Sequence, residues 1–138
     1  NKKIAFLKEL AKKLNLNVEI VYDRAEIFVQ NRREFYDIVT SRAVADLSIL
    51  SELAIPYLKV GGNFIAMKAN YQDELHNAEN IIKKLHSKVT KITEFTLPAT
   101  DMNRGIITIN KEKITNKKYP RSYNTIKKDA QIKLQKQQ

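Results

Sequence analysis

Arg42 is the residue whose type and position point most directly to ligand chemistry. It comes just after the apolar run of residues 35–40, which is typical of a buried strand, so it should stand at that strand's carboxyl end. Ligands of open α/β sheets bind at this edge, and a guanidinium can donate two parallel hydrogen bonds to a carboxylate or phosphate. The alternative is a surface ion pair, for instance with Asp46. We favour the ligand site.

A second candidate is the sequence Asp23-Arg24-Ala25-Glu26, which follows a β-branched run at residues 18–22. That run predicts a short strand, so these four residues also fall at the carboxyl end of a strand, where ligands bind. The ordinary interpretation is the start of a helix, because the helix dipole favours an acid such as Glu26 in the first turn. On residue types alone, the ordinary interpretation comes first.

The end of the chain combines positive charge with aromatic rings. Residues 111–138 hold nine Lys or Arg and two acids, which places +7 of the net charge of +10 there. Lysines and arginines can neutralise nucleic-acid phosphates, and tyrosine rings can stack on bases. The alternative is a disordered, solubilising terminus, which suits residues 133–138 better, and we expect no function beyond about residue 129. The candidate RNA-binding residues are Lys117, Lys118, Tyr119, Arg121, Tyr123, Lys127 and Lys128.

Length and composition bound the class of protein. The 138 residues are 43% hydrophobic and 29% charged with 3 Gly and 3 Pro, as in one globular domain and unlike a fibrous or disordered chain. The absence of cysteine excludes disulfides and thiolate zinc sites. No apolar run approaches the ~18 residues of a spanning helix, so we expect a soluble cytoplasmic protein without a membrane partner. We divide it into a core, residues 1–110, and a basic extension, residues 111–138.

Hydrophobic periodicity predicts the elements that must position these residues. Apolar stripes at helical spacing mark helices within residues 4–14, 47–58 and 75–85, with Asp46 as the N-cap of the second. Strands are expected at residues 18–22, 35–40, 63–68, 89–97 and 105–110, with a turn at Gly61-Gly62. Alternation of strands and helices predicts a doubly wound α/β sheet, and the brief last connection makes its closing pair antiparallel. Such a sheet, parallel with one antiparallel strand, is the pattern of the S-adenosylmethionine (SAM) methyltransferase fold.

Four segments, taken in order, narrow the fold class to a family. They are residues 36–43 (YDIVTSRA), 58–68 (LKVGGNFIAMK), 104–111 (RGIITINK) and 119–123 (YPRSY), the last followed by Lys127 and Lys128. Together they resemble the RsmG (GidB) family, which methylates guanine N7 in small-subunit ribosomal RNA. The resemblance covers residues 1 to about 128. Ala69 departs from the pattern, because a glycine is expected after Met-Lys.

The resemblance implies a cofactor, a substrate and site residues. The cofactor would be SAM, with Ala25 and Glu26 on the adenine side and Arg42 in the same site. The partner would be small-subunit (16S) ribosomal RNA. Guanine N7 carries a lone pair and no proton, so the reaction needs no general base and depends on alignment of donor and acceptor.

The resemblance also implies that part of the family's domain is missing. Its Gly-rich SAM loop and first two strands would precede Asn1, so the chain looks like a C-terminal portion that is inactive without the N-terminal part of the same protein. In the family's sheet, the two absent strands would lie side by side between the strand expected at residues 18–22 and the strand expected at residues 35–40. Without them, either something else fills this gap in the sheet, or the first helix and strand move. The alternatives are a non-catalytic RNA-binding module that uses the basic tail, and a nucleotide-binding subunit completed by another chain.

Overall fold

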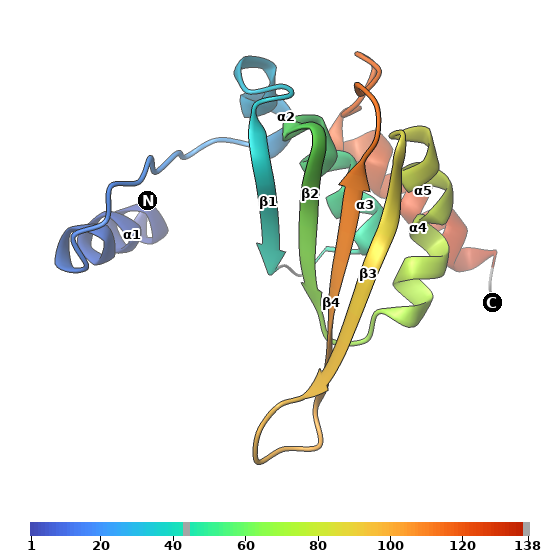
Figure 1. The fold of residues 1–138 in the computed structure, drawn as a ribbon. Coiled ribbons are helices and arrows are strands. Elements are labelled where there is room, and N and C mark those ends of the chain that lie inside the picture. The colour runs from blue at the N-terminus through green and yellow to red at the C-terminus, as the bar shows by residue number, and fades with distance from the viewer. Residues whose placement is uncertain (43–44, 137–138) are drawn as a thin grey trace.

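A four-stranded mixed sheet in the order β1-β2-β4-β3 forms the centre of the protein (Figure 1). The computed structural model describes residues 1–42 and 45–136. β1 (Tyr36–Arg42) is parallel to β2 (Leu58–Lys68), whereas β4 (Asn103–Lys111) is antiparallel to both β2 and β3 (Ser87–Thr96). β3 therefore runs in the same direction as β1 and β2, and the reversed strand, β4, lies between β2 and β3. The predicted α/β class and the antiparallel closing pair are confirmed.

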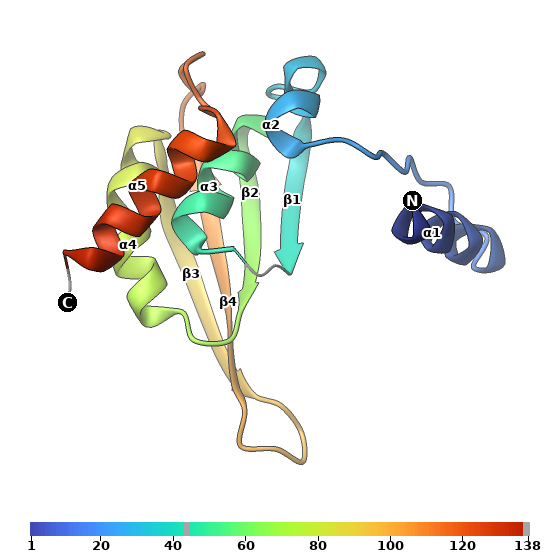
Figure 2. The same ribbon diagram turned by 180° about the vertical axis from the view of Figure 1, so that it is seen from behind.

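Two helices connect the strands, as the apolar stripes predicted. α3 (Leu47–Ala54) joins β1 to β2, and α4 (Gln72–Lys84) joins β2 to β3. Asp46 caps α3 as expected, because its carboxylate accepts a hydrogen bond of 2.9 Å from the Ser48 amide. Both helices lie with α5 on one face of the sheet (Figure 2), whereas a doubly wound sheet carries helices on both faces. The hydrophobic core lies between, and its fully buried members include Leu47, Ile55, Leu58, Phe64, Leu85, Ile107 and Ile109.

The Gly61-Gly62 pair does not form the predicted turn. β2 continues through it, and the register with β1 jumps from the pair Tyr36 and Leu58 to the pair Ile38 and Asn63. Gly61 has φ of 87°, and a Cβ on Gly62 would lie 2.8 Å from the Asp37 carbonyl oxygen. The two glycines therefore form a bulge inside a strand, because only glycine fits both the left-handed backbone and the close approach.

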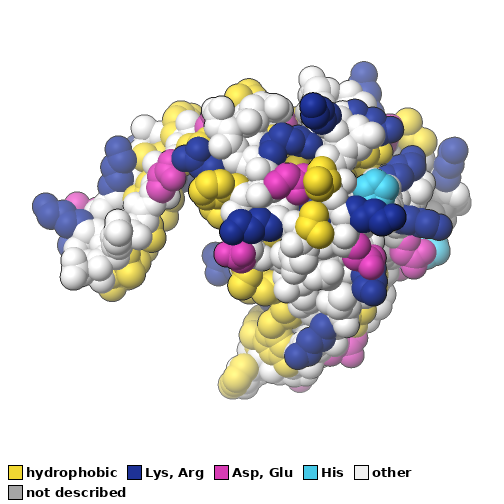
Figure 3. Space-filling view, turned by 45° about the horizontal axis from the view of Figure 1, so that its top comes forward, with side chains coloured by type: hydrophobic (Ala, Val, Ile, Leu, Met, Phe, Trp, Pro, Cys, Tyr) yellow, Lys and Arg dark blue, Asp and Glu magenta, His cyan; other side chains and the backbone are white. Residues whose placement is uncertain are grey.

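The N-terminal helix does not pack on the sheet. α1 (Lys2–Lys13) is followed by Asn15, whose φ is 52°, and the chain then runs extended to α2 (Ala25–Phe28). The strand predicted at residues 18–22 is wrong for this structure, because no neighbouring strand pairs with it. Val18 is 56% and Tyr22 75% exposed, and hydrophobic side chains line one side of α1 (Figure 3).

The basic tail folds against the core. α5 (Tyr123–Gln135) is capped by the hydroxyl of Ser122, the residue before it, and buries Ile126 and Ala130 against Ile49 of α3. Disorder was expected from residue 133, yet α5 continues to Gln135, while residues 137 and 138 lie outside the described part. Within the described residues, no helix has the length and apolarity to cross a membrane.

Candidate functional site

Arg42 stands at the carboxyl end of β1, as predicted. It is exposed, it pairs in register with Met67 of β2, and its side chain makes no hydrogen bond or ion pair with the described residues. The alternative partner, Asp46, instead accepts hydrogen bonds from the Ser48 amide and from the Ser48 hydroxyl at 2.7 Å. The guanidinium is therefore free to bind an anionic group. Ala43, the last residue of the same sequence segment, lies outside the described residues.

Lys68, at the end of β2, fixes the segment that follows Arg42. Its side chain is 6% exposed, its Nζ lies 3.1 Å from Glu74 Oε2, and it donates a hydrogen bond to the Ala45 carbonyl. Burial raises the pKa of Glu74, and the hydrogen bond from Lys68 opposes this shift. Sequence reasoning quoted this lysine only as part of a family segment. Its role was not visible because both partners come from other elements.

Ala25 and Glu26 lie at the opposite end of β1. The Tyr57 hydroxyl, just before β2 begins, donates a 2.5 Å hydrogen bond to the Ala25 carbonyl. Burial raises the pKa of Tyr57 to about 12. The structure thus does not bring Ala25 and Glu26 together with Arg42 (Figure 1), because the strand expected to carry them to that edge is not in the sheet.

Glu26 is linked to the tail through Arg24. Its carboxylate lies 2.6 Å from Arg24 Nε and is 14% exposed on the side chain. The Arg24 guanidinium in turn lies 5.4 Å from the ring centre of Tyr123. A residue predicted to contact the cofactor and one predicted to contact RNA therefore share one arginine, a proximity that no sequence spacing indicated.

An apolar cavity of about 420 Å³ follows β1 between these two ends. Ala25 and Tyr57 line it at one end and Ser41, the neighbour of Arg42, at the other, with Leu50 of α3 along its side. The cavity can accept a flat apolar group, and it extends from Ala25 to Ser41.

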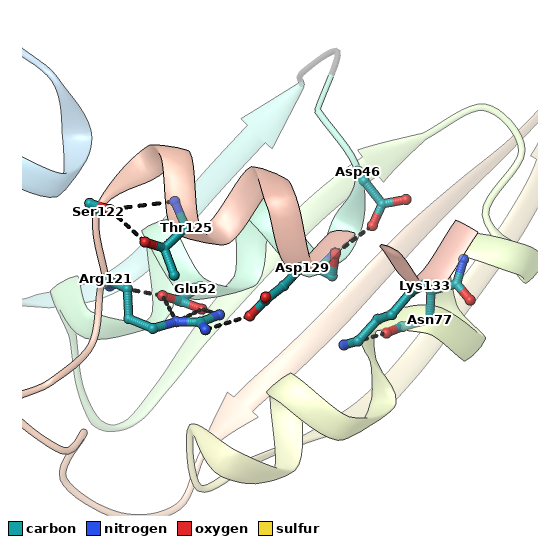
Figure 4. Close-up of polar contacts among 9 residues, drawn as sticks. Asp46, Glu52, Asn77, Arg121, Ser122, Thr125, Asp129 and Lys133 are labelled. Carbon is teal, nitrogen blue, oxygen red and sulfur yellow. Dashed lines mark hydrogen bonds and ion pairs between the residues drawn. The ribbon is translucent and has the colours of Figure 1, made fainter. Parts of the chain in front are cut away.

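Arg121, which Figure 4 shows beside Glu52 and Asp129, holds the tail on the core together with Tyr119. The Arg121 amide donates to Glu52 Oε2 at 2.8 Å, its Nη2 lies 2.8 Å from Glu52 Oε1, and its Nη1 lies 2.5 Å from Asp129 Oδ2. The hydrogen bond with Glu52 raises the pKa of Arg121. Tyr119 is 5% exposed within the hydrophobic core. Both side chains thus have structural partners in addition to their predicted RNA role.

The four predicted lysines are all exposed. Lys117 and Lys118 lie in the loop after β4, and Lys127 and Lys128 lie on α5. Figure 3, which brings the end of the sheet where β4 finishes forward, shows Lys and Arg side chains across it among fewer acidic ones. This end can attract a polyanion, and its prediction as an RNA surface therefore rests on these lysines and on the half-buried Tyr123.

Fold and surface together define a class. β1, β2 and β3 run in one direction, and β4, which lies between β2 and β3, is reversed. This arrangement is consistent with a Rossmann-like methyltransferase. The chain matches the model of the GidB family, described as rRNA small subunit methyltransferase G, over residues 1–103, and it belongs to this family. The resemblance recognised in the sequence is therefore confirmed.

Curated relatives agree with the family. The chain is 53% identical to "Ribosomal RNA small subunit methyltransferase G" of Limosilactobacillus reuteri over 126 residues, which cover 88% of this chain and 52% of the relative. It is 45% identical to the protein of the same name from Clostridium perfringens over 132 residues, 93% of this chain and 55% of the relative. The chain spans about half the length of the curated relatives it matches.

Proposed function

We propose that this chain is part of a SAM-dependent methyltransferase that modifies guanine N7 of 16S ribosomal RNA in the cytoplasm. The observation that carries this is the unpaired guanidinium of Arg42 at the carboxyl end of β1, in a chain that belongs to the GidB family. SAM, when bound, supplies the electrophilic methyl group. Because guanine N7 has a free lone pair, this chain's residues need only bind and orient.

The exposed hydrophobic residues support a longer protein. Leu16 is 52% exposed, and Ile38 on the open edge of β1 is 58% exposed. Exposed large hydrophobic side chains are concentrated between residues 6 and 38, as on a surface that another part of the protein covers, and the chain covers about half of its relatives. We infer that the missing N-terminal part carries the SAM loop and two strands that cover this edge, and that the chain alone is inactive.

In the complete protein, residues 18–22 would then pair as a strand. This would carry Ala25 and Glu26 to the same edge as Arg42, where Ala25 lies against the adenine ring and Glu26 accepts from its amine. The movement requires release of the hydrogen bond from Tyr57 to Ala25. It is feasible because, within the described residues, the only ion pair of residues 14–22 joins Glu19 to Arg32 at 3.5 Å.

Replacing Arg42 with alanine in the complete methyltransferase tests the cofactor site. We expect at least about tenfold weaker SAM binding, since a hydrogen bond to a charged group contributes roughly 1.5–3 kcal/mol. Isothermal calorimetry measures this directly. Lys59→Ala is the matched control, because it removes one positive charge from the opposite end of β2. Equal SAM affinity of wild type and Arg42→Ala would exclude Arg42 from the site.

The lysines of the tail are tested by substitution. Deletion of residues 111–138 would also remove Lys111 and Arg121, which contact the core. The test variant carries four substitutions and has glutamine in place of Lys117, Lys118, Lys127 and Lys128. We expect it to bind single-stranded rRNA segments more weakly. The slope of log K against log salt should become shallower by about 3, since each phosphate contact contributes ~0.7.

The matched control replaces four lysines of α1 (Lys2, Lys3, Lys12, Lys13) and changes the net charge equally. Equal losses in both variants would show that only net charge matters. The exposed lysines also favour a second candidate, a non-catalytic RNA-binding chain. That candidate predicts RNA binding without any SAM binding by the complete protein, so the calorimetry separates the two.

A further inference from the structure

A polar pocket lies at the same edge of the sheet as Arg42 and has no assigned role. It has a volume of about 620 Å³ and lies between residues 69–72, just after β2, and the far ends of β3 and β4. The sheet register places the pocket near Arg42. Met67 of β2 pairs with Arg42 of β1, and the next residue of β2, Lys68, pairs with Gly105 of β4. The residues that line the pocket include Tyr71, Glu94, Thr96 and Asn103.

Tyr71 gives this pocket a fixed wall. Its side chain lies so close over Gly105 that a Cβ there would come within 2.4 Å of Tyr71 Cδ1. Tyr71 is 8% exposed, and its hydroxyl donates a hydrogen bond to Glu94 Oε1. Glu94 pairs in register with Gly105, so the tyrosine holds the carboxylate at the pocket wall. The pocket is thus built from a buried aromatic ring and an oriented acid.

Asn70, Gln72 and Arg104 also line the pocket, and the contacts of Glu94 and Asn103 show which of their atoms can bind a ligand. Within the described part of the chain, Glu94 Oε2 accepts no hydrogen bond. Asn103 Oδ1 accepts a 2.9 Å hydrogen bond from the Thr96 hydroxyl, so its amide N–H groups remain free to donate. Thr96 and Asn103 face each other in the β3-β4 register, two positions from Glu94 and Gly105. The pocket therefore offers carboxylate acceptors beside an amide donor.

We propose that this pocket binds a guanine base of the RNA, with Glu94 as the residue that determines specificity. This rests on the proposed function and deepens it. The Watson–Crick edge of guanine presents two neighbouring donors, N1–H and the N2 amine, which match a carboxylate, and the O6 acceptor, which matches an amide donor. Adenine presents the N1 acceptor in place of a donor there, and the carboxylate repels it. Recognition of that edge leaves N7, on the other edge, outside these contacts.

A base can enter such a pocket only when it is unstacked. Single-stranded or bulged RNA provides unstacked bases, which proteins read on their Watson–Crick edges and stack on aromatic rings. Glu94 and Thr96 are exposed in the structure, so the pocket is open to such a base. The chain's positive charge supplies affinity for any RNA strand, and Glu94 supplies the difference between bases.

The test measures binding of three RNA pentanucleotides to this chain, without SAM. They carry guanine, adenine or inosine between uridines, and inosine lacks only the N2 amine. We expect guanine to bind about tenfold more tightly than adenine, with inosine between them, as good two-point base contacts provide. In Glu94→Gln the difference between guanine and adenine should fall to about twofold or less, since one oxygen that accepts is replaced by a donor.

Glu112→Gln is the control, because it removes an exposed acid from the opposite end of the sheet, where it pairs with Lys88 at 3.6 Å. It should keep the preference for guanine. Equal binding of guanine and adenine by the wild type would overturn the proposal, and so would a guanine preference that persists in Glu94→Gln. The RNA-binding test measures neither SAM binding nor methyl transfer. The SAM calorimetry with Arg42→Ala therefore tests the methyltransferase proposal separately from the guanine pocket.

Discussion

Replacing Glu52 with alanine should lower the free energy of unfolding by about 3–5 kcal/mol, the usual loss when one partner of a buried ion pair is removed. The Glu52 side chain is 1% exposed on α3 and accepts hydrogen bonds from the amide and the guanidinium of Arg121. Alanine leaves that guanidinium with Asp129 alone and opens a cavity between α3 and the tail. The tail should detach more easily as a result.

Urea unfolding followed by circular dichroism measures this loss. Asp129→Ala is the matched control, since it removes the second carboxylate from the same guanidinium, 2.5 Å from Nη1, but is 46% exposed. Exposed ion pairs contribute up to about 1 kcal/mol, so this variant should lose no more than that. Similar losses in Glu52→Ala and Asp129→Ala would contradict the buried role of Glu52. The double variant Glu52→Leu with Arg121→Met should recover much of the stability, because the only charge it leaves without its partner, Asp129, is 46% exposed.

This contact changes how substitutions in the tail must be interpreted. Arg121 is among the residues predicted to bind RNA, yet its amide and guanidinium join α5 to α3. An Arg121 variant that binds RNA poorly could do so because Lys127 and Lys128 on α5 are no longer held in place. Only the exposed lysines report on RNA contact without this ambiguity.

Locally determined features were predicted well from the sequence. The helices α3 and α4 follow from apolar stripes of 3.6-residue period, and the cap of α3 follows from Asp46 just before its stripe. The place of Arg42 follows from the end of an apolar strand. In each case the signal lies within about ten residues of the feature, so no knowledge of distant partners is needed.

Features that depend on distant partners were missed or misplaced. Residues 18–22 have the composition of a strand, but a strand also needs a neighbour to take its hydrogen bonds, and the described residues supply none there. Arg121 was counted as surface charge because its partner, Glu52, is 69 residues away. The pocket acid Glu94 was missed for the same reason, since Tyr71, which orients it, precedes it by 23 residues.

Lys111 is the second charge counted toward the tail that instead binds the core, and its replacement should have a comparably large effect. Its side chain is fully buried at the end of β4, its Nζ lies 2.5 Å from Glu34 Oε2, and it donates to the carbonyls of Ile55 at 3.1 Å and Leu58 at 2.8 Å. Lys111→Met leaves the carboxylate and both carbonyls without this donor. We expect a loss of about 3–5 kcal/mol in the free energy of unfolding.

Lys113→Met is the control, because Lys113 is exposed two residues further on, and surface substitutions change stability by about 0.5 kcal/mol or less. Equal urea midpoints for Lys111→Met and wild type would contradict the prediction. A double variant with Glu34→Gln should regain part of the loss, since it removes the carboxylate left unpaired.

The pH dependence gives an independent test of the same contact. Burial lowers the pKa of Lys111 below its ordinary value, and the hydrogen bond with Glu34 opposes this shift only in part. In the unfolded chain the lysine keeps its ordinary pKa of 10.5. Between these two pKa values the unfolded chain binds more protons than the folded one, so this lysine's contribution to stability rises with pH in that window. The stability difference between wild type and Lys111→Met should therefore widen as the pH rises toward 10.5 from below. A difference that stays constant or narrows would show that burial does not dominate at Lys111.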